Sequence, residues 1–308
     1  VLRNFVKSSS KEITIKKNSL TFTLKSKHFA LAAGALETPR ILFRSSSSKH
    51  PNGIANSSGQ IGKNLMRHLI DLYVLKAGSA TAKGATKQIA FNDFYHLPEG
   101  KGGTVQSFGN MPPNKIILQD LLRDISFHSS IFKWLFQLLL PAVGFYLNKT
   151  FQDSVVLASI VEDTPSQNNR VLNTLNQTSF VYQVPESDKK RLKAMREKIG
   201  NALKSKIKMK IYSGAKNTLL AHACGTCKMG EDPMHSVVNK NCQAHDINNL
   251  YIVDASVFPT SLGVNPALTI AANSWRVAHE ILKAQNIKKK NNLRLATHSI
   301  EDNGLIQI

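Results

Sequence analysis

Apolar and polar residues alternate with the period of a β-strand over several parts of this chain. Residues 13–15 and 20–24 alternate on either side of Lys17-Asn18, which predicts a β-hairpin. Further along, short apolar or alternating runs are separated by polar, glycine-rich and serine-rich stretches. These runs predict an antiparallel sheet and lie at residues 72–75, 155–160 and 180–184.

Two segments combine a buried strand with a following helix, which is the pattern of an α/β fold. Residues 29–33 are continuously apolar and end at Gly34, and Thr38-Pro39 is expected to start a helix. Residues 250–253 predict a second buried strand, with a loop after it. Open α/β sheets bind ligands at the carboxyl ends of their strands, so this loop is a candidate binding loop.

The helix after the second strand is expected to begin at Asn265-Pro266. Asn is a preferred N-cap residue, and Pro suits the first helical position because a missing N–H costs nothing there. A helix N-terminus at this place stabilises negative charge through its N–H groups and its dipole. Apolar residues then recur at helical spacing and predict one buried face, made of Leu268, Ala271, Ala272, Trp275, Ala278 and Leu282.

Two more helices are predicted between these segments. Residues 186–210 predict a basic amphipathic helix over the sheet, with an apolar stripe of Leu192, Met195, Ile199 and Leu203. Residues 131–147 are strongly apolar, are broken by Pro141 and are a little short for a membrane span. A buried or cap helix is the main interpretation. The alternative is an interfacial segment that admits a lipophilic substrate from a membrane.

The net charge of the chain indicates only broad classes of binding partner. The 308 residues include 40 Lys+Arg and 20 Asp+Glu, a net charge of +20. Such a balance favours anionic partners, namely nucleic acid, an acidic lipid surface or an acidic substrate. Three cysteines are an odd number and give no disulfide framework, which favours a reducing compartment such as the cytoplasm.

The cysteines allow one function of a different class. Cys224-x-x-Cys227 and, fourteen residues later, Cys242-x-x-His245 have a spacing close to that of a zinc ribbon. With the positive charge, such a site would indicate a nucleic-acid-binding module. A Cys224/Cys227 redox pair is a weaker alternative, because no thioredoxin-like pattern precedes it.

His222 is the candidate proton acceptor, since the pKa of a histidine suits proton transfer near neutral pH. It opens a run, His222-x-x-Gly-Thr-Cys-x-Met-Gly230, that is followed by residues 249–260 and by Gly263-Val-Asn-Pro-x-Leu-Thr269. These runs resemble the C-terminal signature of the glucose–methanol–choline (GMC) flavoprotein oxidoreductases. Two earlier runs, at residues 32–42 and 58–66, are similar to an internal signature of the same family. The matches occur in family order.

The resemblance implies an α/β plus α+β fold, the C-terminal part of a doubly wound, Rossmann-like FAD-binding domain with an inserted antiparallel-sheet substrate domain. The cofactor domain would comprise residues 1–70 and 221–286, the substrate domain residues 71–220, and the tail residues 287–308. Zinc and nucleic acid are not expected on this interpretation, because the family pattern already accounts for Cys227.

The resemblance also implies roles for single residues in the oxidation of CH–OH donors, with FAD as cofactor. His222 would accept the hydroxyl proton while a hydride passes to the flavin, and Asn265 would bind the substrate oxygen. The cofactor-binding residues would be Ala33, Gly34, Asp254, Ala255, Asn265, Pro266 and Thr269. The substrate is expected to be a small-molecule alcohol, with a slight preference for a bulky or lipophilic one.

One expected feature is missing from the sequence. The Gly-x-Gly-x-x-Gly turn that brings backbone N–H groups to the FAD pyrophosphate does not occur in the 308 residues. We therefore expect a fragment, a truncated member or one half of a split protein whose N-terminal half lies on another chain. The chain alone is expected not to retain FAD. Peripheral membrane contact of a cytoplasmic protein is a further expectation.

Overall fold

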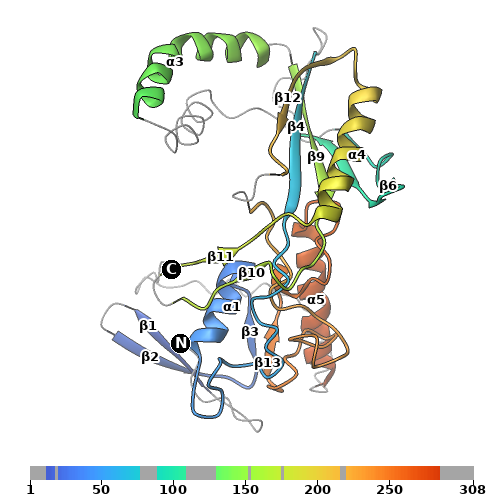
Figure 1. Cartoon of the computed structure of the whole chain (residues 1–308). Coiled ribbons are helices and arrows are strands. Elements are labelled where there is room, and N and C mark those ends of the chain that lie inside the picture. The colour runs from blue at the N-terminus through green and yellow to red at the C-terminus, as the bar shows by residue number, and fades with distance from the viewer. Residues whose placement is uncertain are drawn as a thin grey trace, which may run out of the picture.

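The computed structural model contains two packed regions, an α/β region and an antiparallel sheet region (Figure 1). It describes residues 12–17, 20–76, 89–108, 130–151, 154–174, 177–215 and 220–284. Each region has its own cluster of buried apolar side chains. The tail predicted at residues 287–308 lies outside the described residues.

The α/β region is built on a parallel pair of strands, β3 (Phe29–Leu31) and β13 (Leu250–Ile252), in which Phe29 lies opposite Leu250. The hairpin of β1 (Glu12–Lys17) and β2 (Leu20–Lys25) precedes β3 and confirms the prediction from alternation. The pair is accompanied by helix α1 (Gly34–Arg44), the short 3-10 helix η1 (Ala255–Val257) and helix α5 (Ala267–Ala284). The doubly wound fold is thus represented among the described residues by one parallel pair.

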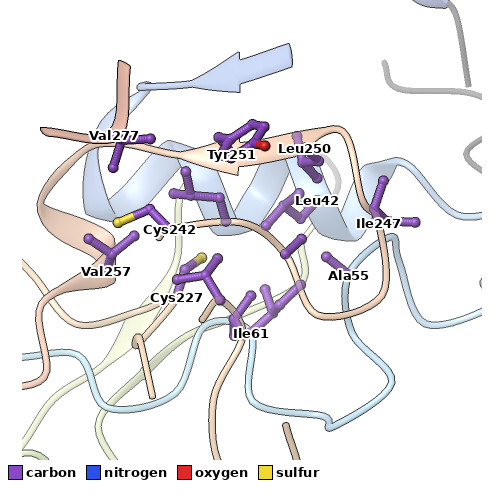
Figure 2. Close-up of a cluster of buried hydrophobic side chains, with 14 of the residues drawn as sticks. Leu42, Ala55, Ile61, Cys227, Cys242, Ile247, Leu250, Tyr251, Val257 and Val277 are labelled. Carbon is purple, nitrogen blue, oxygen red and sulfur yellow. The ribbon is translucent and has the colours of Figure 1, made fainter. Parts of the chain in front are cut away.

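The core of this region draws side chains from segments far apart in the sequence. Figure 2 shows Leu42 of α1, Leu250 of β13 and Val277 of α5 around a shared apolar interior, together with the sulfur atoms of Cys227 and Cys242. All five side chains are buried. Side chains from the N-terminal and C-terminal parts of the described chain therefore bury one another.

Helix α1 begins at Gly34, so the start predicted at Thr38-Pro39 was wrong by one turn. Pro39 lies inside the helix, where it has no N–H to donate to the carbonyl of Ala35 four residues earlier. The structure supplies another donor, because the Thr226 hydroxyl donates to the Ala35 oxygen at 2.6 Å. This distant hydroxyl explains how Pro39 is tolerated within a helix.

The antiparallel region is a five-stranded sheet in the order β12-β4-β9-β8-β5. Its strands are β4 (His68–Lys76), β5 (Ala90–Phe91), β8 (Gly103–Ser107), β9 (Ser154–Glu162) and β12 (Ile207–Tyr212). Two small antiparallel pairs lie outside this sheet, namely β6 (His96–Leu97) with β7 (Gly100–Lys101), and β10 (Arg170–Val171) with β11 (Phe180–Val181), which lies beside α1. The strands predicted at residues 72–75 and 155–160 are confirmed, whereas that at 180–184 is reduced to two residues.

Helix α4 (Glu186–Ala202) covers the antiparallel sheet, as its apolar stripe predicted. Arg196 anchors it through an ion pair of 2.7 Å with the buried Asp71 of β4. The helix ends at Ala202, earlier than predicted, because residues 207–212 form β12. In that segment alternate residues face opposite sides of the sheet, which is a strand period and not a helical one.

Helix α3 (Ser130–Phe151) lies at the end of the antiparallel sheet away from α1 and α5 (Figure 1). The main interpretation of this segment was a buried or cap helix, and the buried form was wrong. Large apolar side chains are exposed on the helix, namely Trp134, Leu138, Leu139, Phe145 and Tyr146. The cap helix stays a prediction. The helix also continues through Pro141. Proline removes one backbone hydrogen bond, and this loss does not end a helix that extends for several turns on both sides of it. No helix in the described ranges is long and apolar enough to cross a membrane.

Helix α5 does not bury the face that its sequence predicted. Leu268 is 82% exposed, Trp275 60% and Leu282 43%, whereas Val277 on the opposite side is buried in the core. The helix packs on β13 through the side that bears Val277, so the more regular apolar stripe faces outward. Among the described residues no segment covers that stripe.

Candidate active site

The loop that carries His222 is held by backbone hydrogen bonds on two sides. Toward β4, the His68 N–H donates to the Ala221 oxygen at 2.9 Å, and Met66 and Cys224 exchange bonds of 2.9 and 3.0 Å. Farther along the loop, the Cys227 N–H donates to Ser256 of η1 at 2.8 Å. Between these anchors His222 adopts a φ of 59°, a left-handed conformation that a side chain disfavours. Both flanks thus hold His222 in a strained position.

His222 contacts a second histidine, which the sequence did not single out. The Nδ1 atoms of His68 and His222 lie 2.8 Å apart. The Nε2 atom of His68 lies 2.7 Å from the Ser261 carbonyl oxygen and 2.9 Å from that of Leu262. His68 is 1% exposed, and its burial lowers its pKa to about 4. It is therefore neutral near pH 7.

His222 and Asn265, the two predicted catalytic residues, line one cavity of about 540 Å³. Asn265 comes from the loop before α5, and its Nδ2 donates to Gln106 Oε1 of β8 at 3.1 Å. A proton-accepting imidazole and a hydrogen-bonding amide thus border the same space. These are the two residues for which the sequence predicted catalytic roles.

The rest of the cavity wall is mainly apolar and comes from the antiparallel sheet and from the residues just before His222. Its apolar members are Ile70, Leu72, Phe108, Ala158, Ile160, Leu220 and Ala221. The buried Arg67 also borders it, with its guanidinium 4.8 Å from the centre of the Tyr182 ring and an N–H donated to the Gly214 oxygen at 2.8 Å. The polar members of the wall come both from strands, as His68 and Gln106 do, and from loops, as His222 and Asn265 do.

The first group of predicted cofactor residues meets at the carboxyl ends of β3 and β13. The Asp254 carboxylate accepts hydrogen bonds from the Gly34 N–H at 2.9 Å and from the Thr38 hydroxyl at 2.5 Å. The Thr38 oxygen in turn accepts from the Ala33 N–H at 3.1 Å, and Ala255 follows in η1. Asp254 therefore ties the first turn of α1 to the second strand of the parallel pair.

The second group of predicted cofactor residues surrounds the start of α5. Pro266 is buried and its carbonyl accepts from the Ile270 N–H at 2.9 Å, which closes the first turn. Thr269 is exposed on that turn. Asn265 precedes the turn and borders the cavity, so the positive end of the α5 dipole lies beside the cavity. Gly34 belongs to the first group of predicted cofactor residues, and the position that a Cβ would occupy on it is open space.

The three cysteines do not form a metal site. Cys224, Cys227 and Cys242 are buried, and desolvation raises the pKa of each thiol, which disfavours the thiolate that zinc needs. Across the described ranges no three His, Cys, Asp or Glu side chains converge as metal ligands. The zinc-ribbon alternative is not supported, because the cysteines serve as small core residues in the packing of Figure 2.

The sequence reasoning missed His68, Gln106 and Arg67. His68 lies only two residues beyond the run at residues 58–66, and a histidine at the start of an apolar strand was the available signal. Gln106 carried no signal, because a glutamine within a short strand is common. These three residues lie on or next to strands of the antiparallel sheet. They border the site only because loops that follow much later in the chain pack against that sheet.

Comparisons with known proteins agree with this arrangement. Residues 164–274 match the family model described as GMC oxidoreductase. The chain is 28% identical over 274 residues to 2-methyl-1,2-propanediol dehydrogenase of Mycolicibacterium austroafricanum, a match covering 84% of the chain and 48% of the relative. It is 28% identical over 273 residues to the fructose dehydrogenase large subunit of Gluconobacter japonicus, covering 83% and 47% respectively.

Among solved structures, pyridoxine 4-oxidase from Mesorbium loti superposes with a TM-score of 0.57 at 17% sequence identity, covering 91% of this chain and 56% of that one. The shared architecture is the α/β fold of FAD-binding oxidoreductases. The chain is similar to GMC oxidoreductases, and residues 164–274 are the part that matches their family model. It spans about half the length of the curated relatives that it matches.

Proposed function

We propose that this chain provides the substrate side of an FAD-dependent oxidoreductase that acts on CH–OH groups. The observation that carries the proposal is the cavity shared by His222 and Asn265, with an apolar wall behind it. A histidine and an amide on one cavity can bind an alcohol oxygen from two directions. Such fixed polar groups orient a carbinol carbon and lower the entropic cost of reaction.

The two side chains divide the work at the alcohol oxygen. His222 accepts the hydroxyl proton, which develops negative charge on the oxygen and makes the carbinol hydrogen a better hydride. The amide nitrogen of Asn265 bears two N–H bonds, one of which is donated to Gln106. The second N–H is suited to donate to the substrate oxygen. FAD, when bound, supplies the acceptor for the hydride.

The described residues fit part of an FAD site. The start of α5 directs a positive helix dipole to the side of the cavity, which suits an electron-rich flavin edge, with Asn265, Pro266 and Thr269 there. Ala33, Gly34, Asp254 and Ala255 would hold another part of the cofactor, where Gly34 leaves open space. The Gly-x-Gly-x-x-Gly turn for the pyrophosphate is not in the sequence.

We therefore propose that a glycine-rich nucleotide-binding unit completes the site, and that it packs on the exposed stripe of α5 formed by Leu268, Trp275 and Leu282. The test is a titration of FAD fluorescence with the 308-residue chain, alone and together with a separately expressed N-terminal half of 2-methyl-1,2-propanediol dehydrogenase. Retention of FAD only in the mixture is expected, and FAD retained by the chain alone would contradict the proposal.

The apolar cavity wall suggests the class of substrate. Ile70 and Leu72 of β4 and Ile160 of β9 present apolar surface behind the histidine and the amide. We propose a small-molecule alcohol with a bulky or lipophilic body, and we assign substrate binding to residues 71–220. The cofactor would belong to residues 1–70 and 221–286. A series of primary alcohols of increasing chain length should show kcat/KM rising with apolar area, and a preference for polyols would contradict this substrate class.

The decisive experiment for the activity compares His222→Ala with His235→Ala in the mixture with the separately expressed N-terminal half, loaded with FAD. His235 is an exposed histidine paired with Asp232 on the surface, so its loss controls for removing an imidazole. Loss of a general base lowers turnover by about 10²–10⁴-fold. We expect that loss in the rate of flavin bleaching by alcohol for His222→Ala alone. Equal bleaching rates in both variants would remove His222 from the mechanism.

A second proposal concerns where the protein acts. The exposed apolar side chains of α3 include Trp134, Leu138 and Phe145, and Lys149 near the end of the helix is exposed beside them. We propose that this surface rests on an acidic lipid layer at the cytoplasmic side of a membrane, as aromatic and basic residues of interfacial helices do. Flotation with phosphatidylglycerol vesicles should recover the protein. Phe145→Asp should abolish recovery, whereas equal recovery of this variant would contradict the lipid contact.

A further inference from the structure

The contact between His68 and His222 determines which nitrogen of each ring carries hydrogen. This inference rests on the proposed function, because it concerns the proton acceptor of that reaction. The Nε2 atom of His68 lies within hydrogen-bond distance of two carbonyl oxygens, those of Ser261 and Leu262. Carbonyl oxygens only accept hydrogen bonds, so Nε2 of His68 must carry the hydrogen.

A neutral imidazole carries one ring hydrogen, so the other nitrogen of His68 bears a lone pair. His68 is 1% exposed, and burial disfavours its charged form. Its Nδ1 atom is therefore an acceptor. The partner at 2.8 Å is Nδ1 of His222, and one of two hydrogen-bonded nitrogens must donate. Nδ1 of His222 is thus the donor.

We propose that His68 is a positioning residue that holds His222 in the tautomer with hydrogen on Nδ1, which makes Nε2 of His222 the atom that accepts the substrate proton. The same contact fixes the plane of the His222 ring. Without it, neutral imidazole exchanges between two tautomers, and only one of them offers Nε2 as a base.

The carbonyls that orient His68 are themselves fixed. The Ser261 hydroxyl oxygen accepts from the Asp163 N–H at 2.7 Å, which ties this loop to the end of β9. Leu262 adopts a φ of 66°, and the Gly263 oxygen accepts from the Thr104 N–H of β8 at 3.1 Å. The loop leads directly to Asn265. His68 therefore connects the proposed base to the loop that carries the proposed oxygen-binding amide.

Two isosteric substitutions separate this role from a purely structural one. In His68→Asn, the amide oxygen can occupy the place of Nδ1 and still accept from His222, but no donor reaches the carbonyls. In His68→Gln, the amide nitrogen can occupy the place of Nε2 and still donate to the carbonyls, but no acceptor faces His222. Each variant keeps one half of the contact, so the two are matched controls for each other.

The variants, each mixed with the separately expressed N-terminal half and loaded with FAD, are compared by the rate of flavin bleaching with alcohol. We expect His68→Asn to remain within about tenfold of the wild type and His68→Gln to fall by about 10²-fold or more, approaching His222→Ala. The opposite order would overturn the proposal, because it would show that anchoring the Ser261–Leu262 loop is the function of His68.

A measurement without activity tests the tautomer itself. The two-bond ¹H–¹⁵N spectrum of the chain labelled with ¹⁵N-histidine distinguishes protonated from unprotonated ring nitrogens. The His222 signals, identified by their loss in His222→Ala, should show hydrogen on Nδ1 and a lone pair on Nε2 at pH 7.5. Hydrogen on Nε2 would overturn the proposal. The expected tautomer in a protein that oxidises no alcohol would contradict the proposed function and leave the tautomer assignment standing.

Discussion

Helices α4 and α5 carry apolar stripes of the same helical period but bury them differently. On α4, Leu192 and Met195 are 1% and 0% exposed against the antiparallel sheet. On α5, Leu268 and Trp275 of the predicted stripe face outward, and the helix packs through the side that bears Val277. The antiparallel region thus buries its helix within the described residues, whereas the α/β region leaves one side of α5 uncovered.

The difference teaches what an apolar stripe predicts. A periodic stripe indicates a face that is buried in the complete assembly, and it does not say which segment covers it. A sheet of five strands offers α4 a wide apolar surface, but a single parallel pair has little surface to offer α5.

The largest effect is expected where the stripe is buried. Met195→Asp would place an unpaired charge in the core under α4, and such a change costs on the order of 4 kcal/mol or more of unfolding free energy. Urea unfolding followed by circular dichroism should show a chain that is unfolded or strongly destabilised. A midpoint close to that of the wild type would mean that α4 does not bury its stripe.

An intermediate effect is expected from pH, through His68. Its pKa is about 4 in the folded chain and about 6.5 in an unfolded one, so the unfolded chain binds more protons between these values. Stability from this group is complete above pH 6.5 and falls as the pH drops toward 4, by up to about 3 kcal/mol.

The measurement is the difference in unfolding free energy between wild type and His68→Asn across this pH range. The subtraction is needed because Asp163, whose pKa burial raises to about 8, has the opposite slope between about pH 4 and 8. That slope is common to both proteins. A difference that does not change with pH would show that His68 is accessible to protons in the folded state.

A smaller effect is expected at the junction of Thr226 with α1. Thr226→Val removes the hydroxyl that donates to the Ala35 oxygen, and an unsatisfied buried carbonyl costs about 1–3 kcal/mol. Pro39→Ala restores an N–H to the helix at the position from which it can reach this oxygen. Adding Pro39→Ala to Thr226→Val should therefore recover stability in urea unfolding. If the two changes are simply additive, the hydroxyl does not compensate for Pro39.

The smallest effect is expected on the open side of α5. Trp275→Asp changes an exposed residue, so the unfolding free energy of the chain alone should shift by about 0.5 kcal/mol or less. The same variant should weaken FAD retention in the mixture with a glycine-rich half, because it adds charge to the proposed contact. Unaltered FAD retention would place that contact elsewhere.

Local patterns predicted the elements that depend on local sequence. The hairpin of β1 and β2, the strands β4 and β9 and the stripe of α4 followed from periodicity alone. The end of α4 did not, because Ile199, Leu203 and Ile207 keep helical spacing into β12. Only the alternation that begins at Ile207 distinguishes the strand, and the two periods overlap there.

The site could be predicted in part, because His222 and Asn265 lie in long family-like runs and do line one cavity. Their partners could not be predicted. The contact of His68 with His222 joins residues 154 positions apart, and that with the Ser261 oxygen spans 193 positions. The hydrogen bond from the Thr226 hydroxyl to the Ala35 oxygen of α1 is likewise a tertiary contact, and nothing in the α1 sequence predicts it.

The parallel pairing of β3 with β13 also has a consequence for the order of folding. Asp254, which follows β13, accepts from Gly34 across 220 positions, so the first turn of α1 completes its hydrogen bonds only after most of the chain has emerged from the ribosome. The hydrogen bonds between β4 and β9 need a much shorter stretch of nascent chain. Contacts between distant residues form slowly because closing a long loop costs entropy. The antiparallel sheet should therefore fold during synthesis, and the parallel pair of β3 and β13 should close last.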